Sequence, residues 1–235
     1  MTSTASKPAL QWPAGYRINP RVEGPSADIV EAFRSMPVAA IGDSMSRNIG
    51  TVGLRQYHGR LDTVMCGPAL TVRVRPGDNL MIHKALMMAR PGDVLVIDGG
   101  GDVLQALVGG LIRTTCVVKK LGGLVVDGAV RDLCEWAEEG MPIFARGHTH
   151  RGPSKDGPGE INVPIACAGL VVLPGDLIVG DADGVIAIPS VEAADILKRC
   201  KAHLEKEAKI RADNATGISD PERFDAVLRA KGLPV

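Results

Sequence analysis

The chain has 235 residues, enough for one large domain with a sizeable buried core. Lysines plus arginines equal aspartates plus glutamates at 27 each, so the net charge is zero and no overall field attracts nucleic acid or an anionic membrane. Aromatic residues make up only 3% of the chain, too few for base-stacking platforms, so we expect no nucleic-acid partner.

The five cysteines are widely spaced and form no Cys-x-x-Cys pair, which argues against a disulfide framework and against a structural zinc site. They are expected to be small buried hydrophobes in a reducing compartment. Met1–Trp12 contains no hydrophobic signal core, and no apolar run reaches membrane-spanning length. We therefore expect a cytoplasmic protein that makes no membrane contact.

Residues 1–25 contain several prolines and little periodicity, which indicates an arm that is ordered only if it packs on something. A helix is expected from Ser26 up to the next proline. A second short helix is expected to open at residues 41–44, where Asp43 or Ser44 is either its N-cap or a site group.

The pattern at residues 61–74 is typical of a strand, interrupted at Gly67–Pro68. A turn then leads into a helix from Leu80, on which the neighbours His83 and Lys84 point to different faces and are best explained as a solvated pair.

A second buried strand is predicted at residues 94–97, closed by the glycine-rich residues 98–102. This turn does not match the dinucleotide-binding fingerprint, because Leu104 stands where the third glycine would be.

Gly109 and Gly110 are expected to break one helical segment and to start another that runs to Lys120. The backbone N–H groups of Gly110, Leu111 and Ile112 would then be free to bind a carboxylate or a phosphate at a helix N-terminus. The alternative is a helix break that serves packing alone.

The stretch Gly122–Asp132 organises the chain. Its apolar run, Leu124–Val126, predicts a buried strand, and Asp127–Gly128 predicts the tight turn that ends it. Arg131 and Asp132 then stand side by side where a buried strand usually presents its chemistry. Asp132 could hold a divalent metal while Arg131 neutralises an anionic substrate; the alternative is a turn salt bridge or a solvated pair.

A helix is expected at residues 133–139 and a third strand at residues 142–145. His148 and His150 could share one strand face, but no third ligand has suitable spacing, so a basic loop is favoured over a zinc site.

Further strands are expected between residues 161 and 188, with Asp181–Gly184 as a hairpin turn. A long charged helix follows at residues 191–213. The chain shows no internal repeat and no linker, so we expect a single domain.

These elements together resemble the RraA-like proteins, which include the bacterial 4-hydroxy-4-methyl-2-oxoglutarate aldolases and the regulator of ribonuclease activity A. The resemblance runs from Ile41 to Gly217. It is carried by four motifs taken together, Pro91–Gly101, Ala106–Gly109, Gly122–Asp132 and Pro174–Val185.

The resemblance implies an α/β fold of the β/β/α swivelling-domain type. The single domain would span residues 26–217, with the N-terminal arm 1–25 before it, a long C-terminal helix, and the tail 218–235 after it. It also implies a homotrimer or homohexamer with active sites at the subunit interfaces.

In the aldolase branch the resemblance implies a Mg²⁺ or Mn²⁺ ion held by Asp132. A second aspartate of the family, about twenty residues earlier, acts through water; Gly110 stands at the matching position, a departure that removes one outer-shell carboxylate. A glutamate from a neighbouring subunit's C-terminal helix completes the family site, with Glu207 the best match and Glu205 the second choice. The ribonuclease-regulator branch lacks the aspartate of the Arg-Asp pair, so Asp132 favours an enzyme.

The expected reaction is aldol cleavage of a 4-hydroxy-2-keto acid to give pyruvate, with oxaloacetate decarboxylation as a companion activity. Both pass through the enolate of pyruvate, which needs a Lewis acid. Asp132 would hold the metal, Arg131 would neutralise the oxyanion, and the substrate carboxylate would lie against Gly109, Gly110, Leu111 and Ile112. The alternative is a non-catalytic regulator that binds another protein.

Overall fold

The computed structural model describes residues 12–217, 220 and 222–235. The strands are, in chain order, β1 (Tyr16–Ile18), β2 (Arg55–Gln56), β3 (Met65–Val74), β4 (Val94–Asp98), β5 (Ala106–Val108), β6 (Gly123–Val130), β7 (Ile143–His148), β8 (Gly159–Ile161), β9 (Ile165–Cys167), β10 (Leu170–Val172), β11 (Leu177–Asp181) and β12 (Gly184–Ile188). The helices are α1 (Ala27–Phe33), α2 (Val38–Ser44), α3 (Leu80–Met88), α4 (Gly110–Val118), α5 (Leu133–Trp136), the 3₁₀ turn η1 (Ser190–Glu192), α6 (Ala193–Ala215) and α7 (Glu222–Ala230).

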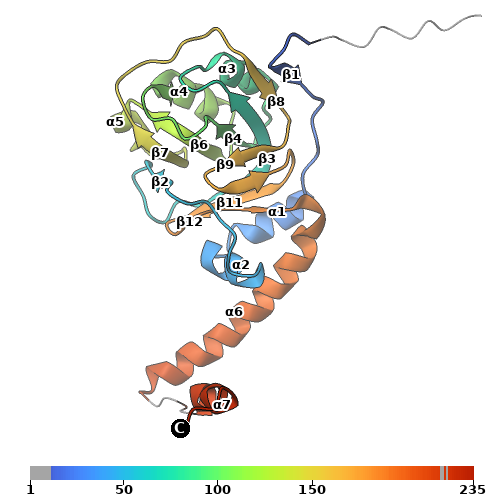
Figure 1. Ribbon diagram of the computed structural model, residues 1–235, viewed down its shortest axis with the longest axis vertical. Helices are drawn as coiled ribbons and strands as arrows, with labels where there is room; N and C mark the ends of the chain where they lie inside the picture. Colours follow the sequence, from blue (N-terminus) through green and yellow to red (C-terminus); the bar gives the residue numbers. More distant parts are fainter. Residues whose placement is uncertain (1–11, 218–219, 221) are drawn as a thin grey trace, which may run out of the picture.

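One large mixed sheet forms the centre of the molecule (Figure 1). Its strand order is β1-β8-β3-β4-β6-β7-β2, with β5 attached to β6 and the β11–β12 hairpin attached to β3. The neighbours β3, β4, β6 and β7 run parallel, so their carboxyl ends lie along the same edge. Polar groups that follow these strands are therefore brought together at that edge.

Both faces of the parallel strands are buried. On β4, Leu95 and Ile97 pack on the face covered by α3 and α4, whereas Val94 and Val96 pack on the face covered by β9, β10 and β12. Burial on both faces explains why this strand is a continuous apolar run rather than an alternating one. The order of helices, sheet and second β layer confirms the expected β/β/α architecture.

The C-terminal helix α6 confirms the long helix predicted from the sequence. Only Ala193, Ile196 and Cys200 are buried on it, and they pack with α1, α2 and the β11–β12 hairpin. The remainder of α6 extends away from the sheet (Figure 1). None of the described helices is both long enough and apolar enough to cross a lipid bilayer.

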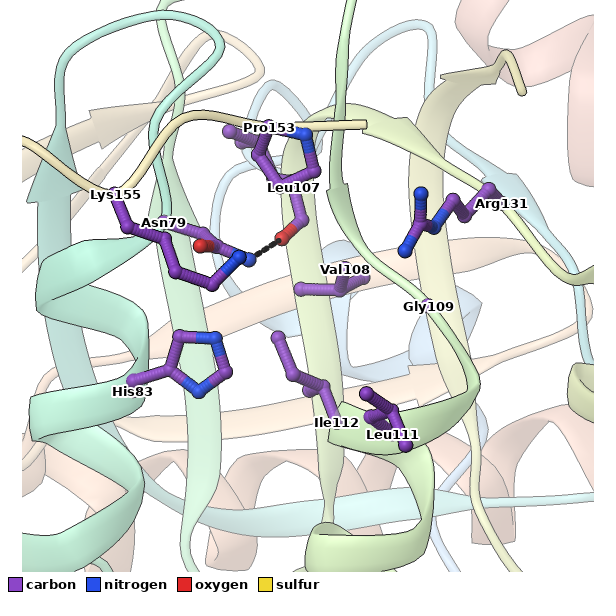
Figure 2. A pocket seen from close by; sticks show the side chains of 10 residues that line it. All are labelled: Asn79, His83, Leu107, Val108, Gly109, Leu111, Ile112, Arg131, Pro153 and Lys155. Carbon is purple, nitrogen blue, oxygen red and sulfur yellow. Dashed lines mark hydrogen bonds between the residues drawn. The ribbon is translucent and has the colours of Figure 1, made fainter. Parts of the chain in front are cut away.

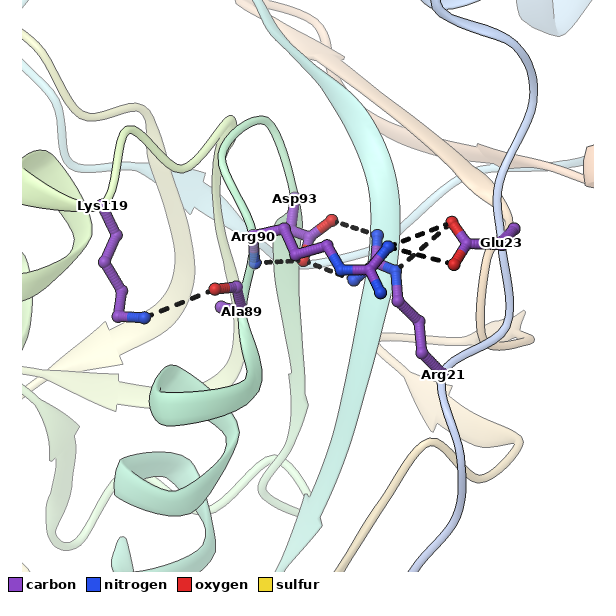
Figure 3. A network of polar contacts seen from close by, with 6 residues as sticks. All are labelled: Arg21, Glu23, Ala89, Arg90, Asp93 and Lys119. Atoms are coloured by element: carbon purple, nitrogen blue, oxygen red, sulfur yellow. Dashed lines mark hydrogen bonds and ion pairs between the residues drawn. The ribbon is translucent and has the colours of Figure 1, made fainter.

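The described part of the N-terminal arm packs against the domain. The guanidinium of Arg21 donates two hydrogen bonds to the carboxylate of Asp93, at 2.7 and 2.6 Å, and this pairing raises the pKa of Arg21 (Figure 3). Asp93 is almost fully buried and also accepts the backbone N–H of Arg90 at 2.8 Å. Arg90 in turn pairs with Glu23 of the arm at 3.0 Å. These ion pairs tie the arm to the turn that precedes β4.

The strand β3 continues through Gly67–Pro68, so the predicted interruption there is wrong. Residues 65–68 pair with β11, and the pairing with β4 begins at Ala69, so the strand changes partner at this point. A Cβ atom on Gly67 would lie 1.9 Å from the carbonyl oxygen of Gly92. Glycine is needed here because two backbones approach closely.

The strand β6 likewise continues through Asp127–Gly128 to Val130, so the predicted turn is a bulge in the pairing with β7. Asp127 is buried and accepts the Nε–H of Arg146 at 2.5 Å and the backbone N–H of Ala168 at 2.7 Å. This aspartate is a structural group of the sheet.

Two predicted helices have different bounds. The helix α2 begins at Val38, whose N–H donates to Asp181 Oδ2 at 2.8 Å, so Asp43 and Ser44 lie in its last turn and neither is an N-cap. The helix α5 ends at Trp136, which is fully buried, instead of reaching residue 139.

We predict that Gly67→Ala destabilises the fold, because its methyl group would press on the Gly92 carbonyl. The free energy of unfolding, measured by urea denaturation, should fall by about 1–3 kcal/mol. Gly42→Ala is the matched control: the added methyl meets no atom within 4 Å, and the helical position should gain about 0.5–1 kcal/mol. Equal stability of the two variants would contradict the packing argument.

Candidate active site

The strand β5 places the glycine pair that begins α4 beside the Arg131–Asp132 pair that follows β6. Residues Ala106–Val108 form a strand and not the predicted helical segment, because they pair in parallel with the end of β6, Ala106 opposite Ala129 and Val108 opposite Val130. Two parallel strands that end together present their following residues side by side. Gly109–Gly110 therefore lies next to Arg131–Asp132.

The carboxylate of Asp132 closes the N-terminus of α4. The backbone N–H of Gly110 donates to Asp132 Oδ2 at 2.8 Å, and Arg131 Nε lies 3.6 Å from the same oxygen. The positive end of the helix dipole and the guanidinium both stabilise this negative charge. Both side chains of the pair remain 40% exposed, so the site is open to solvent.

The expected row of three free amides is reduced to one. Gly110 N–H donates to Asp132, and Ile112 N–H donates to the carbonyl of Gly109 at 3.0 Å because the first turn of α4 is tight. Across the described part of the chain, the N–H of Leu111 has no such partner. An anion at this helix end therefore has one backbone donor available.

The backbone at Asp132 has left-handed torsion angles, φ 62° and ψ 48°. This conformation is unfavourable for most residues, although aspartate tolerates it better than branched residues do. The buried Trp136 supports the corner, since its indole N–H donates to the carbonyl of Arg131 at 2.9 Å. The turn aims the Asp132 carboxylate back at α4.

The glycine pair at 109 and 110 makes room for three charged side chains. A Cβ atom on Gly109 would lie 2.5 Å from Asp132 Oδ2 and 2.9 Å from Arg131 Cγ. A Cβ atom on Gly110 would lie 2.1 to 2.4 Å from the carboxylate atoms of Glu135. Sequence reasoning missed Glu135; the available signal was an acid in the first turn of the helix that follows Asp132.

A small cavity of about 80 Å³ lies beside this corner (Figure 2). Figure 2 shows Lys155 and His83 on one side of it and Arg131 on the other, with Leu111 at the end of α4 below. His83 is half-buried instead of solvated as predicted, whereas Lys84 is exposed. Burial and the nearby charge of Lys155 lower the pKa of His83, so its imidazole is neutral at pH 7.

A second hollow, about 280 Å³ in volume, lies on the other side of Arg131. Asp132 lines it from the end of β6, and His148, Thr149 and His150 line it from the end of β7. The two histidines thus face the hollow that contains Asp132, although they form no cluster of metal ligands with it among the described residues.

The acidic groups at this corner suit a weakly held divalent ion. Asp132 Oδ1 and the Glu135 carboxylate accept no hydrogen bond and form no ion pair within the described ranges. Oxygen donors that are few and partly exposed fit Mg²⁺ or Mn²⁺, which are often bound by one or two carboxylates while keeping several waters. Neither cysteine nor histidine ligands characteristic of structural zinc are needed.

Glu207 lies elsewhere in the single chain. It is on α6, which leaves the domain on the side away from α4 (Figure 1). There His203 Nε2 lies 3.4 Å from Glu207 Oε1 and 3.2 Å from Asp43 Oδ2. Glu205, the second choice, is exposed on the same helix. A role for either glutamate beside Asp132 requires a second copy of the chain.

Comparison with known proteins gives the same picture as the motifs. Residues 27–187 match the family RraA-like: Aldolase/RraA. A protein of Halalkalibacterium halodurans, provisionally named a 4-hydroxy-4-methyl-2-oxoglutarate aldolase, is 41% identical over 81% of this chain and 92% of its own length. The Thermus thermophilus protein named 4-hydroxy-4-methyl-2-oxoglutarate aldolase is 38% identical over 52% of this chain and 74% of its own length.

Among solved structures, Streptomyces coelicolor RraAS2, described as an unusual member of the RNase ES inhibitor RraA protein family, superposes with a TM-score of 0.73 at 28% identity. The match covers 81% of this chain and 98% of that one. The fold, the motifs around Arg131–Asp132 and these similarities together show that the chain belongs to the RraA-like family.

Proposed function

We propose that this protein is a divalent-metal-dependent aldolase that cleaves a 4-hydroxy-2-keto acid of the 4-hydroxy-4-methyl-2-oxoglutarate type to give pyruvate. The observation that carries the proposal is the Arg131–Asp132 pair, held against the N-terminus of α4 beside a cavity lined by basic groups. The names of the Halalkalibacterium and Thermus relatives support the same reaction class.

The chain's own groups would bind the substrate at both ends. Arg131 and the free N–H of Leu111 suit the carboxylate next to the keto group. Lys155, across the cavity, suits the second carboxylate of such a substrate. The neutral imidazole of His83 can accept a hydrogen bond from the substrate hydroxyl.

Cleavage breaks the bond between C3 and C4. The hydroxyl on C4 loses its proton and becomes a carbonyl, and the bonding electron pair passes to the three-carbon fragment as the enolate of pyruvate, which is then protonated at C3. A Mg²⁺ or Mn²⁺ ion held by Asp132 would supply Lewis-acid stabilisation of that charge. Arg131 would add a charge-assisted contact that contributes about 1.5–3 kcal/mol. Oxaloacetate decarboxylation gives the same enolate and is part of the proposal.

The proposal includes assembly into a homotrimer or a homohexamer. Glu207 and Glu205 lie far from Asp132 within one chain, so either glutamate can complete the site only from another copy.

The alternative function is a non-catalytic regulator of the RraA type that binds a partner protein. Similarity to Streptomyces coelicolor RraAS2 supports it. The presence of Asp132 favours the enzyme, because a surface that only binds protein has no need of a carboxylate in strained backbone beside a basic cavity. Binding of a partner without turnover of any keto acid would favour the regulator.

We predict that EDTA abolishes pyruvate release from 4-hydroxy-4-methyl-2-oxoglutarate and that Mg²⁺ or Mn²⁺ restores it. The reason is that a Schiff-base aldolase needs a desolvated lysine, whereas Lys155, the lysine among the residues that line the cavity, is exposed to solvent. A coupled assay for pyruvate measures the effect. Trapping of a substrate adduct by borohydride would contradict this prediction.

Asp132→Asn should lower turnover by about 100-fold, because the amide keeps the shape and the acceptor for Gly110 N–H but loses the charge that holds the cation. Steady-state kinetics and the thermal unfolding midpoint are measured together, and the midpoint should change little. Asp102→Asn is the matched control, since this half-buried aspartate accepts only the backbone N–H of Leu104 among the described residues. Turnover near that of the wild type in Asp132→Asn would show that the site is wrong.

Lys155→Met should raise KM about 10-fold for a substrate with two carboxylates and leave KM for a monocarboxylate substrate nearly unchanged. The exposed Lys84 on α3 provides the control variant, Lys84→Met, for which neither KM should move. An equal rise for both substrates would assign Lys155 to the carboxylate next to the keto group instead.

A further inference from the structure

The carboxylate of Glu135 occupies the space in which a side chain at position 110 would lie. A Cβ atom built on Gly110 would be 2.1 Å from one carboxylate oxygen of Glu135 and 2.3 Å from the other. The chain thus brings an acid from α5 directly over the first residue of α4. The absence of a side chain at Gly110 is what leaves this position open.

This carboxylate has no structural task that is visible in the described residues. It accepts no hydrogen bond and forms no ion pair there, whereas its neighbour Glu138 pairs with Arg113 at 3.1 Å. The N–H of Gly110, which a capping acid would use, already donates to Asp132. Glu135 is therefore a solvent-exposed acceptor that lies over Gly110 and has no protein partner among the described residues.

Asp132 is the N-cap residue of the short helix α5, and Glu135 lies three residues later in that helix. Both carboxylates approach the glycine pair before α4, Asp132 at Gly109 and Glu135 at Gly110, so two like charges gather at this corner. Arg131 lies near Asp132 Oδ2 at 3.6 Å, but no ion pair joins Arg131 to Glu135. A cation between the two carboxylates would remove the repulsion and satisfy both acceptors.

We propose that Glu135 is the second acidic group of the divalent-cation site, acting with Asp132 across the N-terminus of α4. This inference rests on the proposed function, because it assigns a residue to the metal site of that reaction. On this proposal the carboxylate that glycine at position 110 cannot supply comes from α5 instead.

Direct Mn²⁺ binding tests the assignment without turnover. The probe is the electron paramagnetic resonance signal of free Mn²⁺, titrated against wild type, Glu135→Gln, Gly110→Ala and the double variant. Glu135→Gln should weaken the Kd for Mn²⁺ about 10-fold. Gly110→Ala should weaken it similarly, because the methyl group displaces the Glu135 carboxylate, which is the end of a flexible side chain.

The double variant should bind Mn²⁺ no more weakly than either single variant, since both changes remove the same contact. Glu138→Gln is the control, because it removes one negative charge three residues from Glu135. It should bind Mn²⁺ with the Kd of the wild type. The reverse exchange, Gly110→Asp with Glu135→Ala, should restore the Kd to within about 3-fold of wild type by supplying the carboxylate from α4. Thermal unfolding confirms that each variant is folded.

Two failures can be told apart. If Glu135→Gln and Gly110→Ala bind Mn²⁺ as tightly as the wild type while Asp132→Asn does not, the role of Glu135 is wrong and the proposed function stands. If the wild type does not bind Mn²⁺, or Asp132→Asn binds it equally well, the metal-dependent function itself is overturned together with this inference.

Discussion

The parallel pairing of β5 with the end of β6 sets the Arg131–Asp132 pair against the N-terminus of α4. Because the two strands finish together, the backbone N–H of Gly110 meets the carboxylate of Asp132 at 2.8 Å. The N–H of Gly110 and the carboxylate of Asp132 then lock the start of α4 to the corner after β6. Without this pairing, the helix end and the acid would belong to separate parts of the surface.

The charged groups around this corner divide into two sets. The acids Asp132 and Glu135 gather on the glycine side of the corner, while Arg131, Lys155 and the neutral His83 face the cavity. A cation and an anionic substrate would meet at the boundary between the two sets. Arg131 stands at this boundary, because it lines the cavity and its Nε lies 3.6 Å from Asp132 Oδ2. Such an arrangement suits a reaction in which negative charge develops on the substrate next to a metal.

Sequence reasoning identified what depends on local pattern. The buried strands around Val94–Ile97 and Leu124–Val126, the Asp181–Gly184 hairpin and the helix α6 each carry a strong periodic or turn signal, and the structure confirms them. Sequence reasoning failed where the conformation of a segment depends on contacts with residues far along the chain. Ala106–Val108 has no strand pattern of its own and becomes β5 only because β6 offers an edge, and Asp127–Gly128 remains extended because Arg146 and Ala168 hold Asp127. His83 and Glu135 were missed as site residues for the same reason, since the neighbours that give them a role lie on other elements.

The space above residue 110 can hold one acid, and two different positions can supply it. In this chain a side chain at position 110 and the carboxylate of Glu135 exclude each other, because a Cβ atom on Gly110 would lie 2.1 Å from a carboxylate oxygen of Glu135. The volume over the start of α4 is filled from α5 in this chain, so the charge at this corner depends on a residue outside α4 itself.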